Sequence, residues 1–481
     1  MGDAWPVKVL DIHRELSRDF VAGGRGRLSQ TWLRLSALAG IAGLVTARSL
    51  AGPTADSSHR NVLWIVADDM GYGDLSSTGS VNYDTPNIDR IGREGVTMDH
   101  AYVYPVCSPS RAALLTGRTP QRCGVESVLL PGYEAGLSAE IPNAAREFAA
   151  AGYRTALIGK WHLGDRPRSS PNALGFDEFY GFLWGETGYF SHTKKVGGVE
   201  KLDFYQDTTK ADQPGYTTDL YTDRAIRFLQ ENREKPFFLF LAYNAPHYYL
   251  DAPASYQARF SGQPQAMYSA VMKSLDDNIG RLLDTLAQLG LDKSTLVIFL
   301  SDNGAPANGG GRNAPLRGHK NELLEGGIRT PMFARLPGVI PAGARNAGTF
   351  AAWDLLPTSE GLAGLPVSAG FEGRDLQKLL TDPSSGNPEA RCFQYTGPGG
   401  VLSRAVIKQG WKLYATEKPN GGSVIALYDL DRDPGESRDM AAVEPAKVEE
   451  LLGEWNKWAK SLSPALQEWR LSEPVGDRLN K

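Results

Sequence analysis

The chain has 481 residues, of which 41% are hydrophobic and 22% are charged, and its formal net charge is −4. This length is too great for one small core and favours two domains of ordinary globular composition. A weakly acidic chain without a basic run or an aromatic-and-basic module gives no support for nucleic-acid binding, so an anionic ligand would have to be neutralised locally, inside a pocket.

Residues 1–57 differ in character from the rest. The apolar run Leu35–Val45 follows Arg27 and Arg34, is too short for a membrane span, and is typical of the central part of a signal peptide. The charged stretch Met1–Arg27 before it is unusual for a signal, so either the true start lies downstream or the run is a hydrophobic N-terminal helix. We predict a leader over 1–57 and export to the periplasm or the exterior, with no stable membrane insertion after processing. If the run is no signal, the protein is cytoplasmic.

Four near-continuous apolar runs then alternate with helical patterns, which predicts an α/β sheet with strands buried on both faces. The runs are Val62–Val66, Thr155–Gly159, Phe237–Ala242 and Leu296–Leu300. Polar residues follow each run: Asp68 and Asp69, Lys160 and His162, Asn244 and His247, Asp302 and Asn303. Because open α/β sheets bind ligands at the carboxyl ends of their strands, we expect these four groups to converge on one site.

The sequence also predicts three helices and, towards the C-terminus, a change from an α/β pattern to short antiparallel strands. Helices are expected over Ile141–Ala151, Thr218–Gln230 and Tyr268–Leu289. After about Phe371 the pattern becomes one of short antiparallel strands and an amphipathic helix: Arg404–Lys408, Trp411–Tyr414, Ala426–Leu430 and Ala446–Leu462. We therefore predict a large domain over 58–370 and a smaller C-terminal subdomain over 371–481.

The segment Cys107–Arg118 reads C-S-P-S-R-A-A-L-L-T-G-R. Ser108 suits the N-cap of a helix and Pro109 its first position, so the free N–H groups of that helix would point at Cys107, where an anion could sit. The segment resembles the maturation signature of the type I sulfatases, C-x-P-S-R followed by L-T-G-R. The resemblance implies that Cys107 is oxidised to formylglycine, the catalytic nucleophile, by a maturation enzyme.

The resemblance extends from about Asn61 to Leu462 and implies a fold and a metal site. The fold is alkaline-phosphatase-like: a large mixed sheet flanked by helices in the catalytic domain, with a small antiparallel sheet and a helix in the C-terminal subdomain. The metal site comprises Asp68, Asp69, Cys107, Asp302 and Asn303. Oxygen ligands without histidine suit a hard divalent cation, calcium before magnesium.

Further blocks match the family in order. Arg111 corresponds to the arginine that fixes the modified residue, and the block K-W-H-L-G supplies Lys160 and His162, which would share one side of an extended segment. His247 in N-A-P-H and Lys320 in R-G-H-K correspond to the leaving-group side of the site. The block E-G-G-I-R-T-P, residues 325–331, is interpreted as structural, with glycines that permit close backbone packing.

The resemblance implies a reaction sequence. The aldehyde at position 107 is hydrated to a diol, Asp302 accepts a proton from one hydroxyl, and that oxygen attacks sulfur. The cation, Lys160 and Lys320 stabilise the sulfate charge, while His247, helped by Lys320, protonates the departing alcohol. His162 then takes the proton of the second hydroxyl, which expels sulfate.

The predicted function is hydrolysis of sulfate esters on a sulfated carbohydrate. A phosphodiester or phosphonate monoester hydrolase of the same superfamily remains open, as does a non-catalytic, calcium-dependent carbohydrate-binding protein. Six aromatic residues could form a sugar platform or belong to the core: Phe182, Trp184, Tyr189, Phe190, Tyr248 and Tyr249. His192 and His319 are expected to be exposed rather than to bind substrate. Cys123 and Cys392 are expected to be free and buried, although they could pair. The oligomeric state is not readable.

Overall fold

The computed structural model describes residues 59–462, and the ranges 1–58 and 463–481 lie outside the described residues. The predicted leader and export signal fall in the first of these ranges and stay predictions. Within residues 59–462, no helix is both long enough and apolar enough to cross a membrane.

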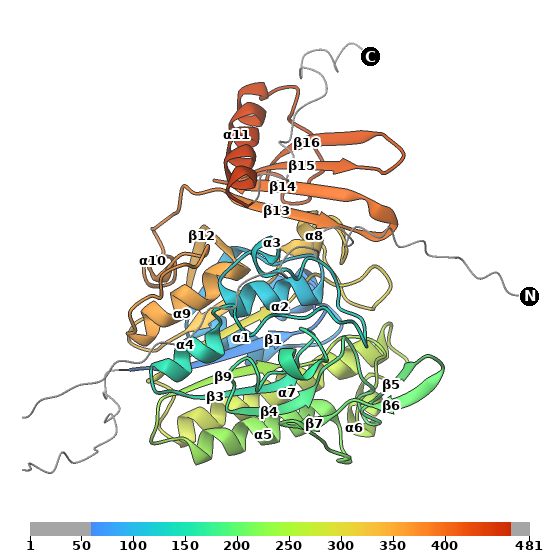
Figure 1. The fold of residues 1–481 in the computed structure, drawn as a ribbon, viewed down its shortest axis with the longest axis vertical. Helices are drawn as coiled ribbons and strands as arrows, with labels where there is room; N and C mark the ends of the chain where they lie inside the picture. The colour runs from blue at the N-terminus through green and yellow to red at the C-terminus, as the bar shows by residue number, and fades with distance from the viewer. Residues whose placement is uncertain (1–58, 463–481) are drawn as a thin grey trace, which may run out of the picture. The chain divides into compact units, whose positions relative to one another are not determined.

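A ten-stranded mixed sheet forms the centre of the larger part of the molecule (Figure 1). Its strands, in spatial order, are β12 (Ala344–Ala351), β2 (Val96–Tyr102), β11 (Met332–Arg335), β10 (Thr295–Ser301), β1 (Asn61–Ala67), β9 (Phe237–Ala242), β3 (Arg154–Lys160), β4 (Glu178–Phe182), β7 (Tyr205–Gln206) and β8 (Thr209–Lys210). The four strands predicted from apolar runs are β10, β1, β9 and β3, which are consecutive neighbours and mutually parallel. In register, Val66 of β1 is level with Leu300 of β10 and Ala242 of β9, so the residues after these strands meet at one edge.

Helices cover both faces of this sheet because its strands are apolar on both sides. Along β1, Val62, Trp64 and Val66 face one core, and the alternate residues face the other. The first face is covered by α2 (Cys107–Thr116), α4 (Ala144–Ala150) and α9 (Leu355–Ala363), and the second by α1 (Pro86–Arg93), α5 (Thr217–Glu231), α6 (Ala254–Phe260) and α7 (Ala266–Gln288). The three predicted helices are confirmed as α4, α5 and α7. Shorter elements are α3 (Pro120–Cys123), α8 (Glu325–Ile328), α10 (Gln377–Thr381) and the hairpin of β5 (Thr193–Val196) and β6 (Val199–Leu202).

The C-terminal part forms a four-stranded antiparallel sheet with one helix, as predicted (Figure 1). Its elements are β13 (Arg391–Thr396), β14 (Leu402–Lys408), β15 (Trp411–Glu417), β16 (Ser423–Asp429) and α11 (Pro445–Leu462). The sequence did not predict β13, because Arg391 and Gln394 interrupt its apolar pattern. Val448, Leu451 and Trp455 of α11 pack on the sheet in a core of their own. The α10 segment packs instead against α9 and β12, and the domain boundary at 371 stays a prediction.

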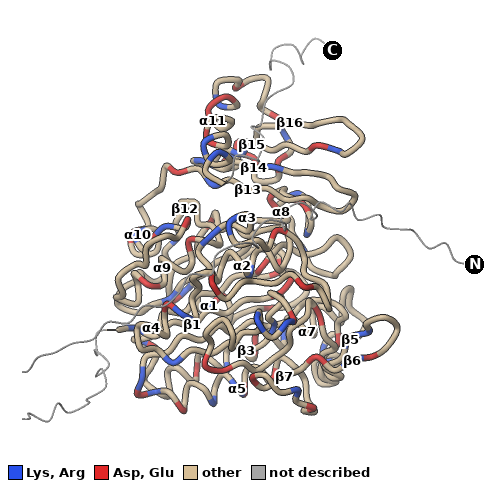
Figure 2. The backbone as a smooth tube through the Cα atoms, viewed as in Figure 1, with Lys and Arg blue, Asp and Glu red and all other residues tan. Residues whose placement is uncertain are grey.

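Charged residues of both signs are distributed over the described chain, including α11, rather than gathered in one segment (Figure 2). One group of them is fully buried and joins the two sheets. Lys412 of β15 lies 3.0 Å from Glu325 of α8 and 2.8 Å from Glu436, and none of the three side chains has solvent exposure. Burial opposes charge on Lys412, but the two carboxylates outweigh it and raise the pKa of the ammonium group.

Glu325 is held by further contacts with both the large sheet and the C-terminal part. Its carboxylate accepts a hydrogen bond from Tyr102 at 3.0 Å, and its backbone N–H donates to Glu436 at 2.8 Å. Since Glu325 opens the E-G-G-I-R-T-P block, the structural interpretation of that block agrees with these contacts.

We expect Lys412→Met to destabilise the protein by about 3–5 kcal/mol, because two buried carboxylates would lose their cation. Lys418→Met is the matched control, since Lys418 is exposed directly after the same strand and its replacement should change stability by no more than about 0.5 kcal/mol. Urea unfolding of both variants measures the difference, and equal midpoints would contradict a role for Lys412 in joining the sheets.

Candidate active site

The predicted polar residues do meet at the carboxyl edge of the large sheet. Asp68 and Asp69 follow β1, Asp302 and Asn303 follow β10, and His247 follows β9. Lys160 ends β3. Cys107 comes from the same edge, because β2 is parallel to β10 through its antiparallel neighbour β11. Lys320 lies on the long connection between β10 and β11.

The helix that carries Cys107 begins earlier than the sequence predicted. It starts at Cys107 with Val106 as its N-cap, so the assignment of Ser108 as N-cap and Pro109 as first position is wrong. The Ser108 hydroxyl instead accepts a hydrogen bond from the Leu129 N–H at 3.2 Å, which removes it from capping. Cys107 therefore lies in the first turn of α2, still at the positive end of the helix dipole.

Buried ion pairs connect α2, β3 and the two acidic strand ends. Arg111 of α2 contacts Asp302 with Nε and Nη2, each at 2.8 Å, and its Nη1 donates to the Lys160 carbonyl at 2.9 Å. The Lys160 ammonium lies 2.6 Å from Asp68. All four side chains are almost fully buried, so each charge depends on its neighbours for stabilisation.

Asp69 is the second centre of contacts. Lys320 donates to both of its oxygens at 2.6 and 2.8 Å, and Asn303 Nδ2 donates to Oδ1 at 2.6 Å. His247 Nε2 lies 3.5 Å from Oδ2. The Cys107 sulfur is 3.5 Å from Asp68 Oδ1 and 3.5 Å from Lys320 Nζ. The predicted nucleophile position thus lies between a carboxylate and an ammonium group.

Burial and neighbouring charge perturb the titration of these groups. Burial raises the pKa of the Cys107 thiol to about 12 and that of Asp302 to about 6. For Asp69 burial acts in the same direction, but Lys320, His247 and Lys160 outweigh it and hold the pKa of that carboxyl below its usual range. An unmodified thiol at this place would therefore be a weak nucleophile at neutral pH.

The two histidines present different ring nitrogens to the site. His162 Nε2 lies 3.1 Å from the Leu129 carbonyl and donates to it, while Nδ1 is buried without a partner among the described residues. His247 Nδ1 lies 2.5 Å from the Tyr248 carbonyl and donates to it. Burial and nearby lysines lower the pKa of both histidines, that of His247 to about 4, although Asp69 opposes this shift at His247.

The backbone around these side chains departs from the extended form that the sequence suggested. His162 has φ 60°, so the segment from Lys160 to His162 is not extended throughout, whereas the sequence had suggested that it is. Asp69 has φ 66°, another left-handed backbone conformation at a non-glycine residue in the site. Close packing fixes the Asp302–Asn303 turn, since a Cβ on the next residue, Gly304, would lie 1.8 Å from the Gly326 carbonyl oxygen. This contact connects the turn to the E-G-G-I-R-T-P block.

The sequence does not reveal two groups that hold the histidines of the site in position. Tyr189 is buried, and its hydroxyl donates to the His247 carbonyl at 2.9 Å, so it anchors the histidine loop rather than binding sugar. The Leu129 carbonyl fixes the tautomer of His162 from a distant loop. No local pattern distinguishes such groups, because their role comes from contacts across the fold.

The structure shows how exposed His192, His319 and the predicted sugar-platform aromatic residues are. The expectation that His192 is exposed is wrong: it is 1% exposed, and its ring stacks on Phe204. His319 is partly exposed beside Lys320. Of the predicted aromatic platform, Phe182 and Tyr189 belong to the core, whereas Tyr248, Tyr249 and Phe190 are 42%, 78% and 43% exposed. The three cysteines of the chain are free and buried.

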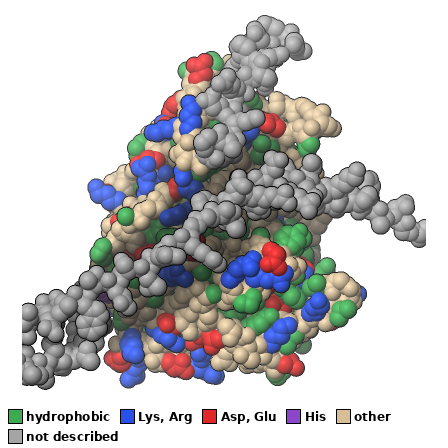
Figure 3. Space-filling view, in the orientation of Figure 1, with side chains coloured by type: hydrophobic (Ala, Val, Ile, Leu, Met, Phe, Trp, Pro, Cys, Tyr) green, Lys and Arg blue, Asp and Glu red, His purple; other side chains and the backbone are tan. Residues whose placement is uncertain are grey.

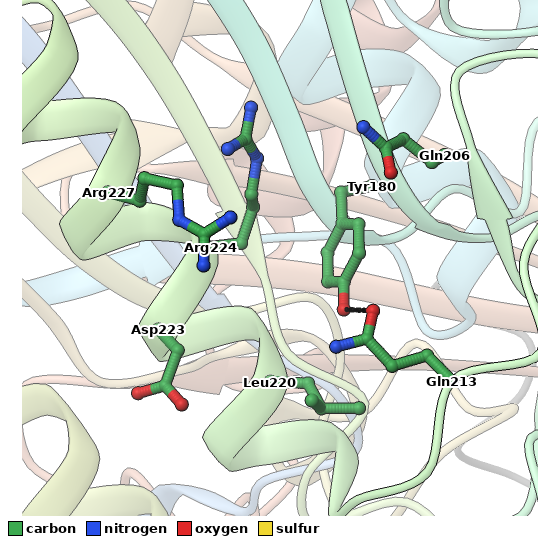
Figure 4. A pocket seen from close by; sticks show the side chains of 7 residues that line it. All are labelled: Tyr180, Gln206, Gln213, Leu220, Asp223, Arg224 and Arg227. Atoms are coloured by element: carbon green, nitrogen blue, oxygen red, sulfur yellow. Dashed lines mark hydrogen bonds between the residues drawn. The ribbon is translucent and has the colours of Figure 1, made fainter.

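The described part of the chain has one cavity beside Lys320 and another at α5, away from the site. One of about 650 Å³ is lined by Lys320, His319, Tyr248 and Tyr249, among others. A separate cavity of about 150 Å³ lies at α5, where Tyr180 donates to Gln213 at 2.7 Å (Figure 4). In that cavity Arg224 is already paired with Glu178. On the face in view, basic and acidic side chains are interspersed, so no extended basic surface is visible there (Figure 3).

The acidic group fits a divalent cation. Single ligand atoms of Asp68, Asp69, Cys107 and His247 lie within 4.8 Å of one another, a group that includes His247 but not Asp302, which the sequence predicted as a ligand. Asn303 Oδ1 is buried without a hydrogen-bond partner among the described residues, which leaves an oxygen free to act as a ligand. Carboxylate and amide oxygens are the donors that hard cations prefer.

Comparisons with known proteins agree with this geometry. Residues 60–365 match the family model described as Sulfatase. The chain is 37% identical to mouse N-acetylgalactosamine-6-sulfatase over 342 residues, which cover 66% of this chain but only 65% of that relative, somewhat less than two thirds. It is 31% identical to human arylsulfatase A, covering 84% of this chain and 88% of that protein.

A solved structure is also similar over nearly its whole length. It is Ps i-CgsB in complex with k-i-k-neocarrahexaose, with 31% identity, a TM-score of 0.77, and coverage of 88% of this chain and 97% of that one. The family model, the relatives and the arrangement around Cys107 together show that the chain belongs to the sulfatase family.

Proposed function

We propose that this protein hydrolyses sulfate esters of a sulfated carbohydrate, using a formylglycine made from Cys107 by a separate maturation enzyme. The observation that carries the proposal is the position of Cys107, at the start of α2 between Asp68 and Lys320. The mouse relative is named for a sulfated amino sugar, and the similar structure holds a carrahexaose, which supports a carbohydrate substrate. We further propose export of the chain, on the apolar run Leu35–Val45 alone.

Charge on the sulfate group would be met by side chains already held in place. Lys160 and Lys320 are held beside the site by ion pairs with Asp68 and Asp69, which limits the reorganisation that their ammonium groups need when an anion arrives. The N-terminus of α2 adds its positive dipole end. Formylglycine at position 107 would supply the nucleophilic oxygen, and Asp302, whose pKa burial raises to about 6 against the opposing effect of Arg111, would accept a proton from it.

The two histidines suit opposite proton transfers. His162 presents the unpartnered Nδ1 of a neutral ring, which is a proton acceptor and suits a general base. His247 uses Nδ1–H for the Tyr248 carbonyl, so Nε2 can give a proton only from the doubly protonated ring. With a pKa of about 4 that form is minor at neutral pH, and Asp69, 3.5 Å away, is the neighbour that favours it. Lys320, whose pKa Asp69 raises against the effect of burial, could assist the departing alcohol.

The cation is proposed to be calcium. Asp68, Asp69, Asp302 and Asn303 would hold it, and a cation there would polarise a sulfate oxygen and neutralise the developing charge. Calcium is preferred to magnesium because a set of several protein oxygens from two strand ends suits its larger and more flexible coordination.

Two alternatives are weaker. A carbohydrate-binding protein without catalysis has no use for the buried set of His162, His247 and Lys320. A phosphoester hydrolase would use the same residues, so the discriminating experiment compares sulfate and phosphate esters of 4-nitrophenol. We expect the higher kcat/KM for the sulfate, and a clear preference for the phosphate ester would contradict the sulfatase assignment.

We expect Cys107→Ala to abolish hydrolysis, because the precursor of the nucleophile is removed, while thermal unfolding changes little. Cys123→Ala is the matched control: Cys123 is also a buried cysteine, but its thiol donates to the backbone carbonyls of Thr119 and Pro120, away from Asp68 and Asp69, and the variant should retain activity. Peptide mass spectrometry of active protein should find formylglycine at position 107. Full activity with only unmodified cysteine there would refute the proposed nucleophile.

We expect His247→Ala to slow alkyl and sugar sulfates far more than aryl sulfates, since an aryl alcohol leaves well without a proton. The loss on the poor leaving groups should be about 10²–10⁴-fold in rate. His162→Ala should slow both substrate classes alike, because its proton transfer follows departure of the alcohol. The rates of both variants on an aryl sulfate and on a sugar sulfate test this division of roles. If both variants lost the same factor in rate on both substrates, the division would be wrong.

A further inference from the structure

A second cavity lies next to the one that contains Lys320, and both share one aromatic side chain. The first, here called the inner cavity, is lined by Lys320, His319, Tyr248 and Tyr249 among others. The second, the outer cavity, has about 620 Å³ and is lined by Tyr249 and by residues of the segment 186–200: Glu186, Thr187, Gly188, Ser191, Thr193, Lys194, Lys195 and Glu200. Both volumes fall in the range of about 300–1,000 Å³ that is usual for small-molecule sites.

The outer cavity is connected to the catalytic residues by its own wall. Gly185 packs so closely on His162 that a Cβ would lie 2.6 Å from the ring. The chain passes directly from this contact into Glu186 and Thr187, which line the outer cavity. Tyr248, at the other side, stacks on His247 with ring centroids 4.4 Å apart. The outer cavity therefore begins one residue after the glycine that packs on His162, and the inner cavity is lined by the ring that stacks on His247.

Tyr249 stands between the cavities as an exposed ring. It is 78% exposed, and Tyr248 holds it edge-on at 5.5 Å with an interplanar angle of 80°. An aromatic face in this position can stack on a sugar ring from either side.

Polar groups of the outer cavity match a hydroxyl-rich and uncharged ligand. The Lys194 ammonium lies 3.0 Å from the Glu186 carboxylate, and Lys195 is directly opposite Glu200 in the β5–β6 hairpin. The two positive and two negative charges balance. The cavity therefore offers donors and acceptors without net attraction for a second anion.

One buried group in this wall is left without a partner. The Thr187 hydroxyl is buried, makes no hydrogen bond among residues 59–462, and belongs to a residue that is only 4% exposed. A buried hydroxyl without a partner costs free energy, and a sugar hydroxyl in the adjoining cavity could satisfy it.

The wall is also held in a fixed shape. Asp203 accepts hydrogen bonds from the backbone N–H groups of Trp184 at 2.8 Å and Leu183 at 3.3 Å. Tyr189 stacks on Tyr216 at 5.5 Å and anchors the His247 loop. A preformed wall loses little entropy when a ligand binds, as a binding subsite requires.

We propose that the outer cavity is a second sugar subsite, which takes an uncharged sugar unit linked to the sulfated one and stacked on Tyr249. This inference rests on the proposed function. The protein would then act on a sulfated sugar within a chain more efficiently than on the free sulfated monosaccharide.

The test compares matched substrates of different length. The full-length, formylglycine-bearing protein is assayed on a panel of sulfated hexoses and hexosamines. The same sulfated sugars are also offered extended by one neutral hexose or by one uronic acid, and 4-nitrophenyl sulfate reports the sulfatase activity itself. We expect the neutral extension to raise kcat/KM about tenfold, which corresponds to about 1.4 kcal/mol.

Two variants test whether the advantage of the extended substrate comes from the outer cavity. Thr187→Val removes a hydroxyl that makes no internal hydrogen bond, so it should fold normally, and Tyr249→Ala removes the shared ring. Each should lower the ratio of kcat/KM for the extended substrate over the monosaccharide by about threefold to tenfold. Lys201→Ala is the control, since Lys201 lies opposite Lys194 in the same hairpin but does not line the cavity, and it should leave the ratio unchanged.

The outcomes separate the two proposals. If the wild-type, formylglycine-bearing protein did not hydrolyse 4-nitrophenyl sulfate, the proposed function itself would be overturned. Aryl sulfatase activity without any advantage for extended sugars, or an advantage that Thr187→Val and Tyr249→Ala leave intact, would overturn the subsite alone. A greater advantage for the uronic acid than for the neutral hexose would contradict the uncharged occupant.

Discussion

The structure depends on one electrostatic constraint at the carboxyl edge of the large sheet. Asp68, Asp69 and Asp302 are buried there, and charges removed from water are stable only when paired. Lys160, Lys320 and Arg111 supply three positive charges within hydrogen-bond distance. The group is therefore close to neutral by itself. A divalent cation would bring it to a net charge of about +2, which matches the two negative charges of a released sulfate ion.

The fold supplies this group from distant parts of the chain. Parallel strands β10, β1 and β9 end level with one another, which brings the carboxylates and His247 together, and α2 brings Cys107 and Arg111. The C-terminal sheet contributes indirectly. Lys412 holds Glu325, which opens the glycine block against which Gly304 packs. In this way a residue of the small sheet helps to fix the turn that carries Asp302.

Much of this arrangement could be predicted from the sequence, and the failures have physical causes. The four central strands were recognisable because both of their faces are buried, which leaves continuous apolar runs. Strand β13 was missed because polar residues interrupt it. The start of α2 was misplaced because Ser108 hydrogen-bonds to Leu129, 21 residues away, rather than capping the helix. His192 was expected in solvent because nothing nearby in the sequence reveals its stacking on Phe204. Residues whose role depends on long-range contacts, such as Tyr189, had no sequence signal.

A calorimetric titration of the chelator-treated protein with calcium tests the proposed cation site directly. We expect one ion to bind per chain and the temperature of thermal unfolding to rise, because an ion that binds only the folded state stabilises it. Asn303→Leu should weaken binding, since it removes the unpartnered amide oxygen, while a distant change such as Lys418→Met should not. Absence of binding by calcium and by magnesium, or equal affinity in Asn303→Leu, would contradict the claim that the buried carboxylates form a cation site.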